Sequence, residues 1–227
     1  MPGRKIPLIT SETYHVLNRG ISNQLVFKTK GNLDRAIKTM KYYQNENPPL
    51  KFSEFFLISK KRRKEIIEKM PIKKQVLIEM IAFCLMPNHF HFILKQVKDQ
   101  GISSYISKFT NSYTRYFNVK NKRHGPLFQG KFKAVRIKSE AQLLHLSRYI
   151  HLNPYSSHII KKAEEIENYP YSSFGEYLGK SKTKFCSKED ILNNFKENCS
   201  YRKFVLERAK YQRTLQTIKS VVMENSS

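Results

Sequence analysis

The stretch from Val76 to Val97, "VLIEMIAFCLMPNHFHFILKQV", decides the fold class. It holds two apolar runs that meet at Pro87-Asn88, and two such runs around a turn-forming pair predict adjacent strands. His89 and His91 stand in the second run, where residues two apart face the same side of a strand. An ordinary core requires no such pair of imidazoles, so this strand is a candidate for a functional site.

Elements before this stretch extend the pattern. Residues 13–20, "TYHVLNRG", alternate in character and end in turn-forming residues, which predicts a strand. Helical spacing of apolar residues predicts a helix from about Leu33 to Gln44, with Asn32 as its N-cap. The basic segment 51–75 has the composition of one or two short, highly charged helices, within an insertion that spans about residues 47–77.

Elements after the stretch follow the same kind of reasoning. Residues 101–121, "GISSYISKFTNSYTRYFNVKN", carry apolar side chains three and four apart, which predicts an amphipathic helix. A short strand is predicted in residues 133–138, "KAVRIK". Another helix is predicted to begin after Ser139, which can cap it, and to end at Pro154.

The resulting order is strand, helix, strand, strand, helix, strand, helix. It predicts an α+β fold with a ferredoxin-like β-α-β-β-α-β core, an antiparallel sheet with helices on one face, and one added helix. We expect this core, with its added helix, to form a domain over residues 1–155. Residues 156–227 are predicted to form a C-terminal extension: an aromatic loop, then a helical tail that opens with a capping box at Ser187 and Asp190.

Charge points to the class of partner. The chain has 42 Lys and Arg against 18 Asp and Glu, a net charge of +24, and such a surplus favours a polyanion as partner. Nucleic acid is the leading candidate and an anionic membrane surface the second. No apolar run is long enough to span a membrane and the N-terminus lacks the apolar centre of a signal peptide, so we expect a cytoplasmic, nucleoid-associated protein.

The two histidines suit one divalent cation, but the H-x-H pattern is common and needs a third ligand to carry meaning. The predicted helix after Ser139 offers one, because Tyr149 and Asn153 are four residues apart on one helical face, with His145 a further turn back. An asparagine carbonyl and two imidazoles form a ligand set that suits Mg²⁺ or Mn²⁺ when water and phosphate oxygens fill the other positions.

These motifs together carry a family resemblance. "NHFHFIL" followed by "RYIHLNP", with "SYTRYFN" and "GPLFQGKFKAV" between them, resembles the single-tyrosine HUH transposases, above all the REP-associated tyrosine transposase branch. The resemblance extends over about residues 13–179. It implies that His89 and His91 bind the metal, that Tyr149 is the nucleophile and that Asn153 completes the metal site. It assigns no role to His145 or His151.

The resemblance also implies an activity and a substrate. Attack by a tyrosine on DNA would leave a covalent 5′-phosphotyrosine and a free 3′-OH, so the chain would be a metal-dependent single-stranded DNA endonuclease and strand transferase. A phenol with a reference pKa of about 10 is mostly protonated at neutral pH, which is why a metal that neutralises the phosphate helps. The implied partner is hairpin-containing single-stranded DNA, with no small-molecule substrate, and the protein would act as a monomer or homodimer.

Basic runs with interleaved aromatic residues suit single-stranded DNA, because the cations neutralise phosphates while bases stack on the rings. We therefore expect DNA contacts from Arg115, Tyr116, Lys122, Arg123, Phe128, Lys131, Lys133 and Arg136. Two alternatives stay open from the sequence. One is a catalytically inactive or domesticated nucleic-acid-binding protein of the same fold, and the other is a nuclease of this fold that uses water in place of a tyrosine.

Overall fold

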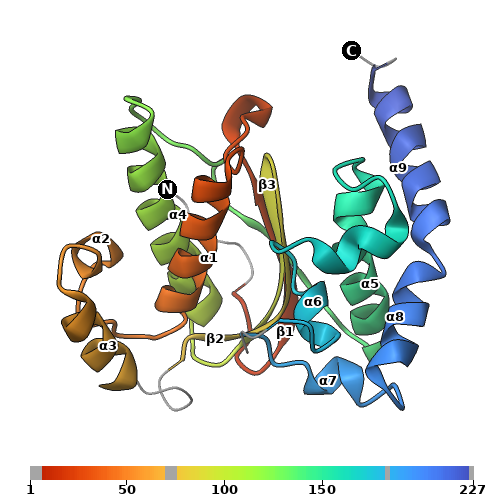
Figure 1. The fold of residues 1–227 in the computed structure, drawn as a ribbon, viewed down its shortest axis with the longest axis horizontal. Coiled ribbons are helices and arrows are strands. Elements are labelled where there is room, and N and C mark those ends of the chain that lie inside the picture. Colours follow the sequence, from red (N-terminus) through yellow and green to blue (C-terminus); the bar gives the residue numbers. More distant parts are fainter. Residues whose placement is uncertain (1–6, 70–75, 182–184, 225–227) are drawn as a thin grey trace. The chain divides into compact units, whose positions relative to one another are not determined.

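The computed structural model describes residues 7–69, 76–181 and 185–224 (Figure 1). In chain order the elements are β1 (Thr13–Arg19), η1 (Ile21–Asn23), α1 (Lys30–Tyr43), α2 (Phe52–Phe55), α3 (Lys60–Lys69), β2 (Ile78–Met86), β3 (His89–Gln96), α4 (Gly101–Lys120), β4 (Lys133–Arg136), α5 (Glu140–Ser156), η2 (Ala163–Asn168), α6 (Phe174–Tyr177), α7 (Glu189–Leu192), α8 (Asn198–Leu206) and α9 (Ala209–Glu224). None of the helices in these ranges is long and apolar enough to cross a lipid bilayer.

The strands form a four-stranded antiparallel sheet in the order β2-β3-β1-β4. This order, with α1 between β1 and β2 and α4 between β3 and β4, is the ferredoxin-like arrangement predicted from the sequence, and the prediction is confirmed. In the pairing of β1 with β4, Tyr14 lies opposite Arg136 and Leu17 opposite Lys133.

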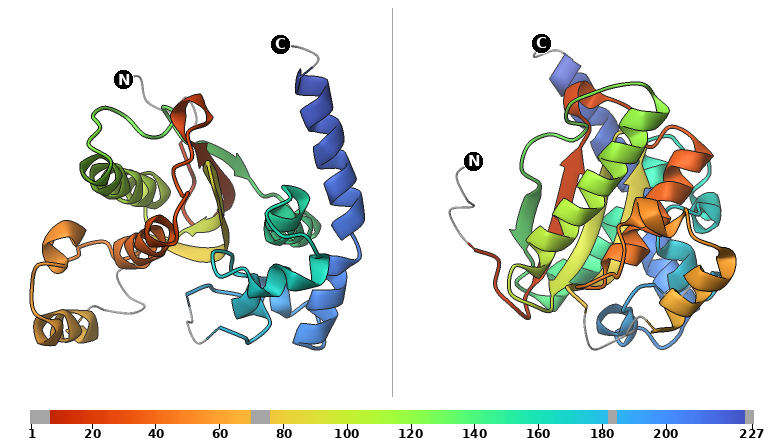
Figure 2. Two further views of the ribbon diagram at one scale, coloured as in Figure 1. Left: turned by 45° about the horizontal axis from the view of Figure 1, so that its top comes forward. Right: turned by 90° about the vertical axis from the view of Figure 1, so that its left-hand side faces the viewer.

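The chain divides into two compact units, and β2 and β3 contribute residues to both. The first comprises the described residues up to 79 together with 87–89 and 94–136. Within it α1 and α4 lie side by side (Figure 2). The buried Tyr113 of α4 donates a hydrogen bond to the Val26 carbonyl at 2.6 Å. At the start of α4 only glycine fits, because a Cβ on Gly101 would lie 2.2 Å from the Leu77 carbonyl oxygen.

The predicted insertion contains the two short helices expected of it, α2 and α3. Aromatic residues anchor it to α1. The Tyr42 hydroxyl donates to the Leu50 carbonyl at 2.7 Å, and the Tyr43 hydroxyl accepts from the Phe52 N–H at 3.1 Å. The rings of Tyr42, Phe52 and Phe55 pack within about 5 to 6 Å of each other. Residues 70–75, the end of the predicted basic segment, lie outside the described residues.

The second unit comprises residues 80–86 and 90–93 and the described residues from 137 onward. Ala82, Cys84 and Met86 stand at every second position of β2 and share one buried cluster with Ile150 and Leu152 of α5. Helix α5 also packs against α8 and α9 (Figure 1). The middle of the histidine-bearing hairpin and the helix predicted to carry the tyrosine therefore belong to the same core.

Some predicted boundaries were wrong for identifiable reasons. Helix α1 begins at Lys30 because Thr29, whose hydroxyl accepts the Asn32 N–H at 3.2 Å, is its cap. The capping box predicted at Ser187 is absent: the Ser187 N–H is bound to the Met80 carbonyl, and α7 starts at Glu189. The predicted helical tail is divided into α7, α8 and α9, and the loop before it contains α6. The domain boundary at 155 stays a prediction.

Candidate metal and DNA site

Strand β3 presents its two histidines on one face. His89 is partly exposed and His91 is buried, with 6% of its surface accessible. Phe90 and Phe92 alternate with them and are fully buried, with ring centroids 4.4 Å apart. The alternation of a strand therefore separates the imidazoles from the phenylalanine rings, as the sequence predicts.

His89 is held in one tautomer by its neighbour. Its Nδ1 lies 2.6 Å from Oδ1 of Asn88, and because a carbonyl oxygen only accepts, Nδ1 carries the proton. Burial, and after it the charge of Arg19, lower the His89 pKa to about 4. The imidazole is therefore neutral at physiological pH, with Nε2 unprotonated. This is the state in which a histidine binds a metal, and a hydrogen bond from the other ring nitrogen is typical of metal-bound histidines.

Helix α5 brings Tyr149 to His91. The helix is capped by Ser139, whose hydroxyl accepts the Gln142 N–H at 3.2 Å, which confirms the predicted start. The Tyr149 ring meets the His91 ring edge-on, with centroids 5.8 Å apart and planes at 89°. The backbone carbonyl of Tyr149 accepts a hydrogen bond of 3.0 Å from the Gln212 side chain of α9. Two candidate residues that are 58 positions apart in the sequence are thus in contact.

Asn153 lies one turn further along α5 and is 95% buried, with 5% of its surface accessible. Its side-chain Nδ2 is buried and has no hydrogen-bond partner. A buried amide nitrogen without a partner costs free energy, so Asn153 is a candidate for contact with a group outside the chain. Since the oxygen and nitrogen of an asparagine amide exchange places by a rotation of the side chain, this position can equally present a carbonyl oxygen to a cation.

Helix α5 does not end at Pro154, contrary to the sequence-based expectation. Pro154 is inside the helix, which continues to Ser156. The ring removes one N–H donor in the last turn, but the Ser157 N–H still reaches the Asn153 carbonyl at 3.0 Å. Burial of the last turns of α5 holds Asn153 in a helical conformation that a following proline disfavours.

His145 does not lie with Tyr149 and Asn153. It is exposed, its Nδ1 is 2.6 Å from the Arg148 guanidinium, and its ring packs 6.2 Å from that of Phe204 in α8. The expectation that His145 shares the helical face of Tyr149 and Asn153 was wrong. Because a helix has about 3.6 residues per turn, each step of four residues rotates the side chain further around the axis. After two such steps, from Asn153 back to His145, the side chain faces α8.

His151 is a structural residue. It is fully buried, and burial lowers its pKa to about 3. Its Nε2 lies 2.8 Å from the Ser173 hydroxyl, which in turn accepts the Phe83 N–H of β2 at 3.0 Å. Its Nδ1 lies 2.8 Å from the Tyr201 hydroxyl, which donates to the Ser147 hydroxyl at 3.0 Å. These contacts fasten α5 to β2 and α8, and they account for the histidine without chemistry.

The donors fit a hard divalent cation. His89 and His91 would supply imidazole nitrogens and Asn153 a carbonyl oxygen, a set of donor types that suits Mg²⁺ or Mn²⁺ together with water or phosphate oxygens. No group of three or more His, Cys, Asp or Glu side chains able to hold a metal occurs within residues 7–69, 76–181 and 185–224. The candidate set has only two members of those residue types, and its third is the buried, unpaired amide of Asn153.

Several of the predicted DNA-contacting residues line surface cavities of the first unit. Arg115 and Tyr116 of α4 line a cavity of about 600 Å³. Arg115, Lys122 and Arg123 line another of about 500 Å³ at the end of α4. Lys122 is exposed, whereas the Arg123 guanidinium already donates to the Asn118 side chain at 2.7 Å and shapes the loop.

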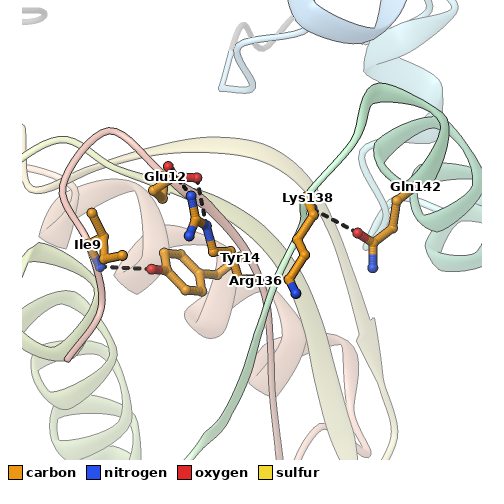
Figure 3. A network of polar contacts seen from close by, with 6 residues as sticks. All are labelled: Ile9, Glu12, Tyr14, Arg136, Lys138 and Gln142. Carbon is orange, nitrogen blue, oxygen red and sulfur yellow. Dashed lines mark hydrogen bonds and ion pairs between the residues drawn. The ribbon is translucent and has the colours of Figure 1, made fainter. Parts of the chain in front are cut away.

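The strand β4 carries the other predicted cations. Lys131 precedes it and Lys133 begins it, and both side chains are exposed. Arg136 donates to both carboxylate oxygens of Glu12 (Figure 3), which neutralises its charge locally. Arg136 is therefore a weaker candidate for a phosphate contact than the sequence indicates.

Phe128 does not present its ring to solvent. It is 7% accessible, and its ring centroid lies 6.1 Å from that of Phe27 and 6.2 Å from that of Tyr113. Packing in the first unit accounts for this side chain, so the expectation that Phe128 stacks on a base was wrong. The sequence pattern of alternating cation and ring cannot distinguish a ring that faces out from one that faces in.

Three residues of the site were not found from the sequence: Arg19 and Asn88, which act on His89, and Gln212, which binds the Tyr149 carbonyl. Asn88 and Arg19 stand in the quoted motifs "NHFHFIL" and "TYHVLNRG", but the sequence assigned neither a role toward His89. Gln212 belongs to no motif. These roles come from contacts that depend on the fold, for which a single sequence gives no signal.

The comparisons with known proteins agree with this fold. The family model described as "Transposase IS200 like" matches residues 54–153, which include β2, β3, α4, β4 and most of α5. The resemblance to these transposases predicted from the sequence is confirmed over that segment.

A solved structure of a REP-associated tyrosine transposase bound to a REP hairpin is similar to the chain with a TM-score of 0.52. The match is 17% identical and covers 82% of this chain and 90% of that one, so it shows a shared fold. No protein of curated function matches the chain by sequence.

Proposed function

We propose that this chain is a transposase that cuts and rejoins single-stranded DNA through a covalent 5′-phosphotyrosine, that it uses a divalent metal, and that its substrate is hairpin-containing DNA. The observation that carries the proposal is the contact of Tyr149 with His91, 5.8 Å between ring centroids. Asn153, one turn further along α5, adds a buried Nδ2 without a hydrogen-bond partner. Tyr149 packs partly against the apolar cluster of the second unit, and in addition its ring meets an imidazole.

Each residue has a proposed task. His89, His91 and Asn153 hold a Mg²⁺ or Mn²⁺ ion, which when bound polarises the scissile phosphate and neutralises its charge. The Tyr149 oxygen attacks the phosphorus, forming a P–O bond to the phenol, and the bond to the 3′ oxygen breaks. The phenol loses a proton and the departing 3′ oxygen gains one. Because one phosphodiester replaces another, the step is reversible and requires no ATP.

Positioning of Tyr149 comes from α9 and from its own helix. The Gln212 side chain binds the Tyr149 carbonyl, and His151 fastens the same part of α5 to β2 and α8. A nucleophile must be held close to its attack geometry, so these contacts support catalysis although none of them touches the phosphate.

The proposed DNA contacts are the exposed cations Arg115, Lys122, Lys131 and Lys133, with Tyr116 as a partly exposed ring and Arg123 and Arg136 in secondary roles. Hairpin DNA is the proposed partner because the similar solved structure is described as bound to a REP hairpin. Whether the protein acts as a monomer or homodimer stays a prediction.

An alternative of another class is a nucleic-acid-binding protein that keeps the fold without catalysis. The net charge of +24 supports it equally well. The presence of His89, His91, Tyr149 and Asn153 together favours the enzyme, because these are the residue types that metal-assisted attack by a tyrosine requires.

The test is a covalent trap. Purified protein is incubated with labelled hairpin-containing single-stranded DNA and Mn²⁺, and an SDS-resistant adduct is expected in the wild type. The adduct should disappear in Tyr149→Phe and with chelator, and persist in Tyr155→Phe, a matched change on the same helix. Cleavage without an adduct would indicate a water nucleophile, and binding with neither would indicate the non-catalytic alternative.

The metal ligands have a test that does not depend on activity. Titration of the protein with Mn²⁺, followed by the loss of the free-ion electron paramagnetic resonance signal, should show one site. We expect His91→Ala and Asn153→Ala to weaken it by about 10- to 100-fold, while His145→Ala leaves it unchanged. Equal binding by all variants would contradict the proposed ligand set.

A further inference from the structure

The cavity of about 600 Å³ in the first unit is lined by cations and by no carboxylate. It lies among α1, the start of α2 and α4, and its size is within the range of ligand pockets. No Asp or Glu is among the described residues that line it. Its five cationic side chains are Arg35, Lys51, Lys108, Arg115 and Lys120.

None of these five cations forms an ion pair with a carboxylate within the described part of the chain. Lys108 donates to the Glu46 backbone carbonyl at 2.6 Å and Lys120 to the Asn32 side-chain oxygen at 2.8 Å, and both of these acceptors are uncharged. The Glu46 carboxylate itself is bound to Lys98. The Glu54 carboxylate accepts the Lys51 backbone N–H at 3.2 Å but does not line the cavity, so the described lining holds five cations and no carboxylate.

Arg35 is the decisive residue of the cavity. Its guanidinium carbon lies 4.4 Å from the ring centroid of Phe52, 4.6 Å from that of Phe56 and 5.1 Å from that of Tyr116. Its Nε is buried and has no hydrogen-bond partner. Aromatic faces stabilise and orient a guanidinium, but they accept none of the hydrogen bonds that it can donate.

A partly buried guanidinium with an unmet donor, among four other unpaired cations, is costly unless an anion completes it. Phosphate fits best, because a guanidinium binds two phosphate oxygens with parallel hydrogen bonds and lysines add charge. Ser53, Asn111 and Ser112 also line the cavity and supply neutral donors for further oxygens.

We propose that this cavity binds backbone phosphates of the DNA substrate, with Arg35 at its base and Arg115 and Lys120 at its α4 side. The proposal rests on the DNA-binding part of the function proposed above, but it shares no residue with the proposed catalytic set. It gives the insertion a role, since Phe52 and Phe56, two of the rings that orient Arg35, come from α2 and the residue that follows it.

The experiment measures hairpin affinity of the full chain by fluorescence anisotropy over a range of salt concentrations. We expect Arg115→Ala to weaken binding about 5- to 10-fold at 0.1 M salt, and to reduce the slope of log K against log salt by about 1. Lys196→Ala is the matched control. It removes one exposed cation outside the cavity and should change affinity less than about 2-fold.

Arg35→Gln tests the base of the cavity. We expect a loss of about 10-fold or more with a similar change in slope. Arg35→Gln also removes the contacts of the guanidinium with Phe52 and Phe56, so the variant could fail to fold. In that case the conclusion rests on Arg115→Ala, because the Arg115 side chain is exposed and makes no such contact. Affinities and slopes of both variants equal to those of Lys196→Ala would overturn the proposal.

A second arm separates DNA from a free anion. Inorganic phosphate is titrated into the wild type and followed by ³¹P line broadening. If Arg35→Gln abolishes phosphate binding while hairpin affinity and slope are unchanged, the cavity takes a free anion and the proposal fails. If the wild type forms no covalent adduct but Arg115→Ala still loses affinity and slope, the cavity proposal stands and the proposed chemistry fails.

Discussion

Removal of one hydroxyl, in Tyr201→Phe, is predicted to destabilise the second unit well beyond the usual effect of so small a change. The hydrogen bonds around His151 run in one direction. The Ser147 hydroxyl donates to the Leu144 carbonyl, so it accepts from Tyr201. Tyr201 has then given up its only proton and accepts from His151 Nδ1–H, which leaves Nε2 to accept from Ser173.

The size of the effect follows from this directionality. Tyr201→Phe keeps the ring and deletes two buried hydrogen bonds. Loss of the bond to Ser147 costs about 1 kcal/mol, and loss of the other strands the Nδ1–H of His151, a buried donor whose unpaired state costs about 1 to 3 kcal/mol. A change of tautomer would relieve that donor but leave a bare acceptor. The expected loss is about 3 kcal/mol, or about 6 to 12 °C in Tm for a chain of this length.

Urea unfolding followed by circular dichroism measures the loss, which should lower the midpoint without changing the m-value. Tyr211→Phe, at an exposed tyrosine of α9, is the control and should stay within about 0.5 kcal/mol of wild type. The double variant Tyr201→Phe/His151→Leu should lose less stability than the sum of the losses measured in the two single variants, by about 1 kcal/mol or more. A Tyr201→Phe protein as stable as Tyr211→Phe, or strict additivity, would refute the assigned chain of hydrogen bonds.

Two further predictions concern the first unit. Burial lowers the His15 pKa to about 4, so its contribution to stability is complete above pH 6.5 and is lost as the pH falls toward 4. When the pH is lowered from 7 to 5, the free energy of unfolding of the wild type should fall by about 2 kcal/mol more than that of His15→Gln. Parallel plots of unfolding free energy against pH would contradict the lowered His15 pKa. Gly101→Ala, whose Cβ would meet the Leu77 carbonyl, should cost about 2 to 3 kcal/mol in urea unfolding, whereas Gly130→Ala, with open space around it, should be nearly neutral.

The fold was predictable because its signals are local. The apolar runs on either side of Pro87-Asn88, and the helical spacing in residues 101–121, each identify an element without reference to the rest of the chain. Boundaries failed where a tertiary contact decided them. Serine is a common helix cap, but the Ser187 N–H is bound to the Met80 carbonyl of β2, and α7 begins only at Glu189.

The candidate site was predictable to the extent that it follows from periodicity and family motifs. Strand alternation places His89 and His91 on one face, and helical spacing relates Tyr149 to Asn153. The environment was not predictable. The sequence cannot indicate that Gln212 reaches the Tyr149 carbonyl or that Arg35 stands among three rings, because both depend on how segments distant in sequence pack.

The buried position of His151 has a consequence for how mutational scans of this protein are read. In a screen for DNA cleavage, substitutions at His151 and at Tyr149 would both score as null, and a histidine two residues from a tyrosine invites a reading as a general base. The two classes separate only when soluble yield is recorded beside activity. Tyr149 variants should accumulate as folded protein, and His151 variants should be depleted from the soluble fraction.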